Sequence, residues 1–368
     1  PGVEYFVHFS VVTRQAEPLI PIGHEIAQEQ FRLPLETEKD SYEASGKALG
    51  WKAENGKVVV SSSNVYFELD KATGMVTSYK VNGTEFFDKA FGVQPNFWRA
   101  PNDNDYGNSN PKRLQIWKES SRDFKVSDTA VREEGETVLM SVTYDLPAGN
   151  QYLITYRIYR DGVVNVNVKF TQTDREAEKT EVLEDTNLAT FTPGKKVKKK
   201  DVLEVPRIGV RFRIPHVMNR VEYFGRGPVE NYVDRNAGSM VGRYKTSVEE
   251  MYVNYVRPQE NGHRTDTRWV SFTNTVGRGL LVLAEKTIGF NALQNTVEDF
   301  DSEESSHPYQ WRNRSPKEVA GKNEAEAKNV LRRMTHVNDI TPRDFVEVCI
   351  DMKPVSYTHL RAHETTLH

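Results

Sequence analysis

The segment QYLITYRIYRDGVVNVNVKFTQ, residues 151–172, constrains the fold more than any other part of the chain. Apolar and polar residues alternate along both of its arms, as they do in strands that bury one face. Asp161-Gly162 separates the arms, and this pair suits turn positions with positive φ. The segment therefore predicts an antiparallel β-hairpin.

Similar segments follow one another through residues 51–353. GKVVVSSSNVYFELDKATGMVTSYKVNGTEFF carries turn signals at Thr73-Gly74 and Asn82-Gly83, and DFVEVCIDMK alternates as a strand. Turn signals are closely spaced and no strand–helix–strand alternation appears, which favours an antiparallel sandwich over a parallel α/β sheet. We expect helical structure only at 111–121 and, as a single turn after Pro228, within 227–236.

Both ends of the chain differ from this middle part. Residues 4–12 predict one strand without an earlier partner, so we expect residues 1–35 to be the end of a partial β-sandwich domain. Residues 36–50 are polar and mixed in charge, as linkers are. Residues 354–368 show no strand or helix signal, and we expect a disordered, non-native tail. Its histidines lack the H-E-x-x-H spacing, so no metal site is predicted there.

Composition excludes several functional classes. The net charge of the 368 residues is −3, which argues against an electrostatic nucleic-acid binder. No run of about 18 apolar residues occurs, so no transmembrane helix and no membrane partner are predicted. A single cysteine, Cys349, excludes a cysteine-based zinc site.

Three polar clusters could carry chemistry, and four of their carboxylates are candidates for the pair that glycoside hydrolysis needs. Retention of configuration requires two carboxyl groups roughly 5–5.5 Å apart. The candidates are Asp103 and Asp105 in WRAPNDND, Glu230 in GRGPVENYVDRN, and Glu260 in RPQENGHRTDTRW. In the alternative interpretation, which we favour, these carboxylates bond loop amides and the neighbouring arginines. Trp98 and the asparagines beside it would also suit a sugar-binding rim.

Taken together, the motifs resemble a known family. WRAPNDND, RIGVRFRIP, VEYFGRGPVENYVDR and MYVNYVRPQENGHRTDTRW resemble, in this order, the C-terminal region of bacterial β-galactosidases of glycoside hydrolase family 2. PIGHEIAQEQFRLP resembles the end of the immunoglobulin-like β-sandwich domain that precedes it. The resemblance implies an all-β fold in which residues 51–353 form a large antiparallel supersandwich, similar to galactose mutarotase.

The resemblance also implies where the reaction takes place. In the family, the acid/base and nucleophile glutamates lie in an upstream TIM barrel, so we expect no catalytic residue in this chain and no activity from it alone. The expected partners are a galactoside substrate, such as lactose, and the catalytic barrel, either fused or as a large subunit. We expect no cofactor or metal in this chain, and a divalent cation or sodium of the full enzyme would lie in its barrel.

The family's mobile loop beside the active site falls on five residues here. They are Tyr106, Gly107, Asn108, Ser109 and Asn110. The position of a sugar-binding tryptophan in some members falls on Glu347, so that platform is expected to be replaced. The residues that we expect to face sugar are, with Glu347, Trp98, Arg99, Asp103, Asn104, Asp105, Glu260, Asn261 and His263.

Two other functions stay open from the sequence. One is a non-catalytic carbohydrate-binding module. The other is an aldose epimerase, which needs a positioned histidine acid and a glutamate base, with His216 and His263 as the interior histidine candidates. The bacterial cytoplasm and the periplasm are both compatible with the sequence.

Overall fold

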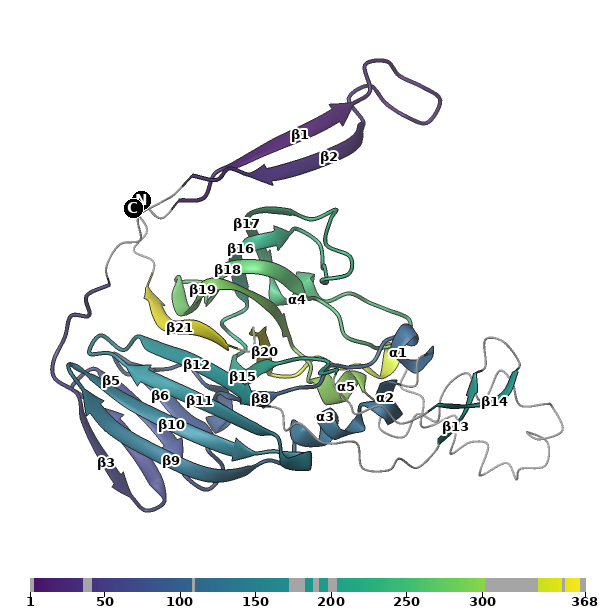
Figure 1. Cartoon of the computed structure of the whole chain (residues 1–368). Coiled ribbons are helices and arrows are strands. Elements are labelled where there is room, and N and C mark those ends of the chain that lie inside the picture. The colour runs from purple at the N-terminus through teal and green to yellow at the C-terminus, as the bar shows by residue number, and fades with distance from the viewer. Residues whose placement is uncertain are drawn as a thin grey trace.

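The computed structural model describes residues 3–35, 42–107, 110–171, 183–187, 192–197, 204–301, 337–352 and 355–364. These residues are mostly in antiparallel strands, which confirms the all-β prediction (Figure 1). The part of the chain described here contains no helix that is long and apolar enough to cross a membrane.

Twelve strands form the largest sheet. They are β8 (Gln94–Asn96), β9 (Lys125–Glu134), β10 (Thr137–Asp145), β11 (Gln151–Ile158), β12 (Val164–Thr171), β15 (Gly209–Pro215), β16 (Arg220–Gly227), β17 (Met240–Ser247), β18 (Arg264–Thr273), β19 (Arg278–Leu293), β20 (Phe345–Asp351) and β21 (Val355–Glu364). The main path runs β17-β16-β18-β19-β21-β12-β11-β10-β9. From β19 a branch continues through β20 and β15 to β8.

A five-stranded sheet packs against β9–β12 (Figure 1). Its strands are β3 (Gly50–Glu54), β4 (Lys57–Ser61), β5 (Val65–Asp70), β6 (Val76–Val81) and β7 (Thr84–Glu85). The ring centroids of Phe67 and Tyr156 lie 5.5 Å apart between the sheets. The buried Tyr144 hydroxyl donates to the Gly74 carbonyl at 2.7 Å. Apolar side chains that alternate along each strand thus meet in one core, as sandwich packing requires.

The predicted hairpin is confirmed in β11 and β12. These strands pair from Gln151↔Thr171 to Ile158↔Val164. The turn between them is closed by the Tyr159 amide, which donates to the Val163 carbonyl at 2.9 Å. Of the pair between the arms, only Gly162 adopts positive φ, at 91°. A Cβ there would lie 2.5 Å from a Val81 methyl, so close packing also favours glycine.

Helices are short. They are α1 (Asp103–Gly107), α2 (Asn110–Arg113), α3 (Gln115–Ser120), α4 (Val248–Met251) and α5 (Val297–Phe300), with 3-10 turns η1 (Asp88–Ala90), η2 (Pro147–Gly149) and η3 (Val337–Asp339). The helical prediction for 111–121 is confirmed by α2 and α3. The predicted turn of helix within 227–236 is wrong, because the buried Asn231 side chain bonds the Arg226 and Val229 carbonyls and holds the backbone in another conformation.

The C-terminal prediction also needs correction. Val355–Glu364 form β21, which pairs with β12 on one side and β19 on the other. Each neighbour would otherwise present an unpaired edge, so a strand between them satisfies two rows of backbone groups at once. Because that gain comes from distant strands, the local sequence does not reveal it. The non-native origin of residues 354–368 stays a prediction.

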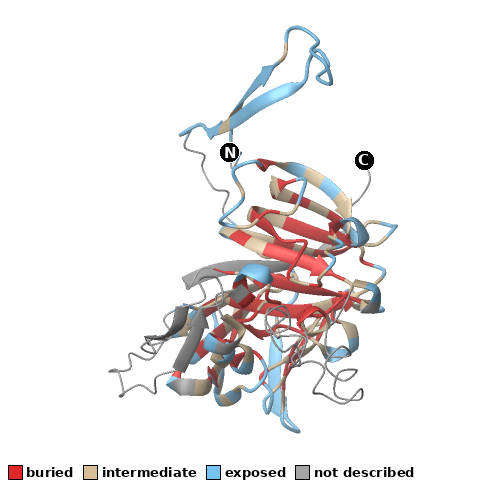
Figure 2. Ribbon diagram, turned by 90° about the vertical axis from the view of Figure 1, so that its right-hand side faces the viewer, coloured by how far each residue is buried: buried red, intermediate tan, exposed pale blue. Residues whose placement is uncertain are grey.

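Two smaller sheets complete the described structure. β13 (Leu183–Asn187) pairs with β14 (Thr192–Val197). β1 (Phe6–Val12) and β2 (Glu25–Arg32) form a ribbon that projects from the body (Figure 1). Figure 2 shows buried residues concentrated in the body, whereas the ribbon is mostly exposed.

Candidate functional site

Asp105 organises the segment that contains WRAPNDND. Its carboxylate accepts two bonds from Arg99, at 2.6 and 2.9 Å, and one from the Asn110 amide at 2.9 Å. At the start of α1, Asp105 and Asn102 each accept a bond from the other's backbone N–H, both at 2.9 Å. Burial alone would raise the pKa of Asp105, but the bonds to Arg99 and Asn102 hold it below the ordinary value. The preferred interpretation, turn builder and arginine partner, is confirmed for this carboxylate.

The outer side of α1 contacts the third polar cluster. Arg257 lies 3.2 Å from the Asp103 carboxylate, and its guanidinium lies 3.8 Å from the Tyr106 ring centroid. The Glu260 amide also donates to the Ala100 carbonyl at 3.3 Å. The structure therefore brings together two clusters that are about 150 residues apart in the sequence.

The remaining residues of the expected cleft loop are placed only in part. Asn104 is exposed on α1, Gly107 ends that helix and Asn110 begins α2. Asn108 and Ser109 lie outside the described residues. The described part of the loop is thus anchored at both ends by short helices.

Trp98 does not present an open ring. Only 4% of it is exposed, and its indole N–H donates to the Asp301 carboxylate at 2.7 Å. Lys118 pairs with the same carboxylate at 2.7 Å. The expectation that Trp98 faces sugar is therefore not supported, since its body packs in the core and its polar edge already has a partner.

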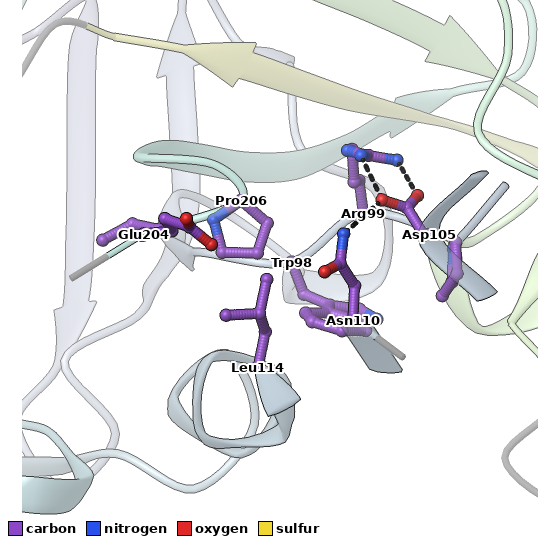
Figure 3. Close-up of a pocket in the computed structure, with 9 residues that line it drawn as sticks. Trp98, Arg99, Asp105, Asn110, Leu114, Glu204 and Pro206 are labelled. Atoms are coloured by element: carbon purple, nitrogen blue, oxygen red, sulfur yellow. Dashed lines mark hydrogen bonds and ion pairs between the residues drawn. The ribbon is translucent and has the colours of Figure 1, made fainter. Parts of the chain in front are cut away.

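A small pocket lies beside Asp105 (Figure 3). Its volume is about 180 Å³, and it is lined by Trp98, Arg99, Pro101, Asp105, Asn110, Leu114, Glu204, Val205 and Pro206. The polar side chains of Arg99, Asp105 and Asn110 stand together in the close-up, with Leu114 and Pro206 nearer Glu204. Sites for drug-sized ligands are roughly 300–1,000 Å³, so this pocket is too small to enclose a disaccharide.

A buried ion cluster lies deeper, under the third polar cluster. Arg207 pairs with Glu260 and with Asp351, each at 2.6 Å. His263 lies 3.6 Å from the other Asp351 oxygen. Burial, reinforced by the Arg207 charge, lowers the pKa of His263 to about 3. Glu260 and His263 are each 6% exposed, so they hold the loop and do not face a sugar.

Sequence reasoning missed Arg207 and Asp351. A partial signal was present in RIGVRFRIP, where Arg211 and Arg213 occupy alternate positions of β15 and share a face, while Arg207 precedes the strand by two residues. Arg211 and Arg213 on that face surround Glu347, which is 3% exposed and accepts a bond from Arg213 at 2.9 Å. Glu347 is therefore not accessible to a sugar in this structure: burial raises its pKa, and its partners are arginines.

The second cluster joins the third through Glu230. Its carboxylate accepts bonds from the Gly262 amide at 2.8 Å, from Arg235 at 2.6 Å and from the Tyr255 hydroxyl. Asn261 is 2% exposed and accepts a bond from the Val253 amide at 3.2 Å. Asn261 therefore supports the loop from inside, contrary to the sugar-facing expectation.

Comparison with known proteins identifies the family. The family model described as beta galactosidase small chain matches residues 61–325. The chain belongs to this family. The matched range includes all three polar clusters and the buried arginines.

Individual relatives agree with the family match. A β-galactosidase of Priestia megaterium is 32% identical over 78% of this chain and 25% of its own length. Those of Streptococcus thermophilus and Vibrio cholerae are 30% and 27% identical, over 83% and 73% of this chain. The chain spans about a quarter of the length of these relatives.

Proposed function

We propose that this small-chain region forms the C-terminal part of a glycoside hydrolase family 2 β-galactosidase. The full enzyme would hydrolyse terminal β-D-galactosides, such as lactose, with retention of configuration. This chain would wall the active-site cleft with the segment around Tyr106 and Asn110. The acid/base and nucleophile glutamates would lie in a TIM barrel outside this chain, as would any divalent cation or sodium.

The arginine partners of the four candidate carboxylates support the proposal that the catalytic residues lie outside this chain. Asp103, Asp105, Glu230 and Glu260 each have an arginine partner within 3.2 Å. A carboxylate committed to a guanidinium is a poor nucleophile or proton donor, because the ion pair stabilises its charged, bonded form. Among the residues that the structure describes, no group of three or more His, Cys, Asp or Glu could hold a metal ion.

The first test uses the pure chain alone. A chromogenic β-galactoside should not be cleaved, and galactose should produce no binding heat in calorimetry. Fresh α-galactose should mutarotate at the uncatalysed rate in a polarimeter. Turnover of the galactoside would contradict the proposal, binding heat would favour a carbohydrate-binding module, and accelerated mutarotation would favour an epimerase.

The second test joins this chain to the remaining three quarters of a related β-galactosidase. Residues 51–352 replace the matched quarter of the Priestia megaterium β-galactosidase, which gives a chimera with that enzyme's own remaining sequence. We expect galactoside hydrolysis by the chimera and none by the same enzyme lacking the quarter. A folded chimera without activity would count against a role of this chain in the cleft.

A further inference from the structure

β21 occupies a place in the large sheet that its two neighbours define. Residues 164–169 of β12 pair with it on one side and residues 278–284 of β19 on the other, both antiparallel (Figure 1). β12 also pairs with β11, and β19 with β18, so both neighbours are held in the sheet by other strands as well. We call the strand position between residues 164–169 and 278–284 the acceptor slot.

The neighbours of the acceptor slot bury large apolar side chains at alternate positions. Val164, Val166, Val168, Leu280 and Val282 are each at most 2% exposed. A strand between them therefore has one row of positions on the core-facing side of the sheet. Large apolar residues fit that row best, because apolar pairs between neighbouring strands stabilise a sheet.

The residue types in β21 match this row poorly. The register sets Ser356, Thr358, Leu360 and Ala362 opposite the buried valines and leucine. Leu360 is the one large apolar residue of these four. The place of β21 in the sheet therefore depends more on its backbone ladders than on its residue types.

We propose that the acceptor slot binds an extended peptide strand with large apolar residues at alternate positions, in place of β21. The proposal does not depend on the proposed function. A strand in the slot forms backbone hydrogen bonds with two edges, whereas a strand added at the end of a sheet forms them with one. The two ladders supply affinity whatever the sequence, and the buried row supplies the preference for apolar residues.

Such a peptide has to displace β21, which belongs to the same chain as the slot. Residues 352–354 alone separate β20 from β21, so the local concentration of β21 at the slot is high. Leu360→Pro lowers this competition in the full chain, because proline removes a backbone donor and is poorly tolerated between two paired strands. Ser356→Val combined with Thr358→Val raises it, because both changes place valine in the core-facing row.

The experiment measures the fluorescence anisotropy of the labelled peptide KVTVTVTVTK with the full chain. The control peptide KTTVVVVTTK has the same composition without the alternation. We expect the Leu360→Pro chain to bind the alternating peptide about tenfold more tightly than it binds the control, and about tenfold more tightly than the wild-type chain does. The chain with Ser356→Val and Thr358→Val should bind it about tenfold more weakly than the wild type. Tyr357→Val combined with His359→Val, at the positions between, should leave the affinity unchanged.

Two results would overturn the proposal. Equal or absent binding of the two peptides by the folded Leu360→Pro chain would show that the slot does not select an alternating strand. Equal affinity of all the chains for the alternating peptide would place its binding outside the slot. Thermal melting shows which chains fold, and the two valines in the core-facing row should raise the melting temperature by about 2 °C or more. If Leu360→Pro prevents folding, the comparison of the wild type with the Ser356→Val, Thr358→Val chain decides.

Discussion

The N-terminal ribbon exposes apolar side chains, whereas the body buries charged side chains. Each departs from the usual distribution, in which apolar side chains are buried and charged ones are exposed. In the ribbon, Phe9, Val11 and Phe31 share one face and are 55–57% exposed. In the body, Arg207, just before β15, and Glu347, in β20, are 5% and 3% exposed. The difference lies in partners within the described chain: Arg207 and Glu347 each have opposite charges beside them, whereas the apolar face of the ribbon is exposed.

The body is stabilised by its buried apolar core, in which a few buried charges are paired over long range, and the ribbon is held mainly where it meets the body. Phe6 packs edge-on against Phe224 with ring centroids 6.5 Å apart. The Gln30 side chain exchanges two 2.8 Å hydrogen bonds with the Val241 backbone. Both contacts lie on the ribbon face opposite Phe9, so the body stabilises one face and leaves the other exposed.

The largest effect on stability is expected when the buried guanidinium of Arg207 is removed. Arg207→Met would leave the buried Glu260 and the partly exposed Asp351 without their guanidinium, and removing the partner of a buried charge typically costs about 3–5 kcal/mol of unfolding free energy. Urea unfolding followed by tryptophan fluorescence measures the loss. Lys89→Met is the control, because Lys89 and its partner Asp344 are exposed. Equal urea midpoints for the two variants would show that the buried cluster does not stabilise the body.

A second test titrates the buried cluster. His263 has an ordinary pKa of 6.5 and a folded pKa of about 3, so the folded protein keeps the imidazole neutral. As pH falls below 6.5, the unfolded chain takes up a proton and the folded chain does not. The stability contribution is thus complete above pH 6.5 and is lost progressively toward pH 3.

Proton uptake by His263 in the unfolded chain should lower the unfolding free energy by about 1 kcal/mol when the pH falls from 7.5 to 5.5. His263→Asn should lack this part of the pH dependence, whatever its stability at pH 7.5. Urea unfolding of both proteins at the two pH values provides the comparison. An identical loss in the wild type and the variant would contradict the buried, neutral state of His263.

The smallest effect on stability is expected in the ribbon. Phe9→Glu should change the unfolding free energy of the body by less than about 0.5 kcal/mol, because Phe9 is exposed. It should reduce self-association of the isolated chain, since exposed apolar faces promote association. Light scattering against concentration measures this. Gln28→Glu, on the opposite face of the ribbon, is the matched control and should associate like the wild type.

Much of the fold could be predicted because its determinants are local. Alternation in residues 151–172 predicted a hairpin, and the proline and apolar spacing in 111–121 predicted short helices, both of which are confirmed. β21 could not be predicted, because its stability comes from two distant edges. The 228–235 loop was misassigned because the buried Asn231 side chain outweighs the helix signal of Pro228.

The candidate site was predictable in its residue types and not in their orientation. The density of arginines beside Asp105 correctly indicated an ion pair, since Arg99 is only six positions away. Nothing local indicated that Trp98 and Glu347 point into the body. Arg207 escaped notice because its partners are 53 and 144 positions away.

The sequence by itself thus determined the strands, the turns and the family motifs, because alternation, turn chemistry and neighbouring charges act over a few residues. Only the tertiary structure decided which charges are buried together, which faces are open and where β21 inserts. Those features depend on contacts between segments far apart in the chain, and their free energy exists only once the sheets have assembled.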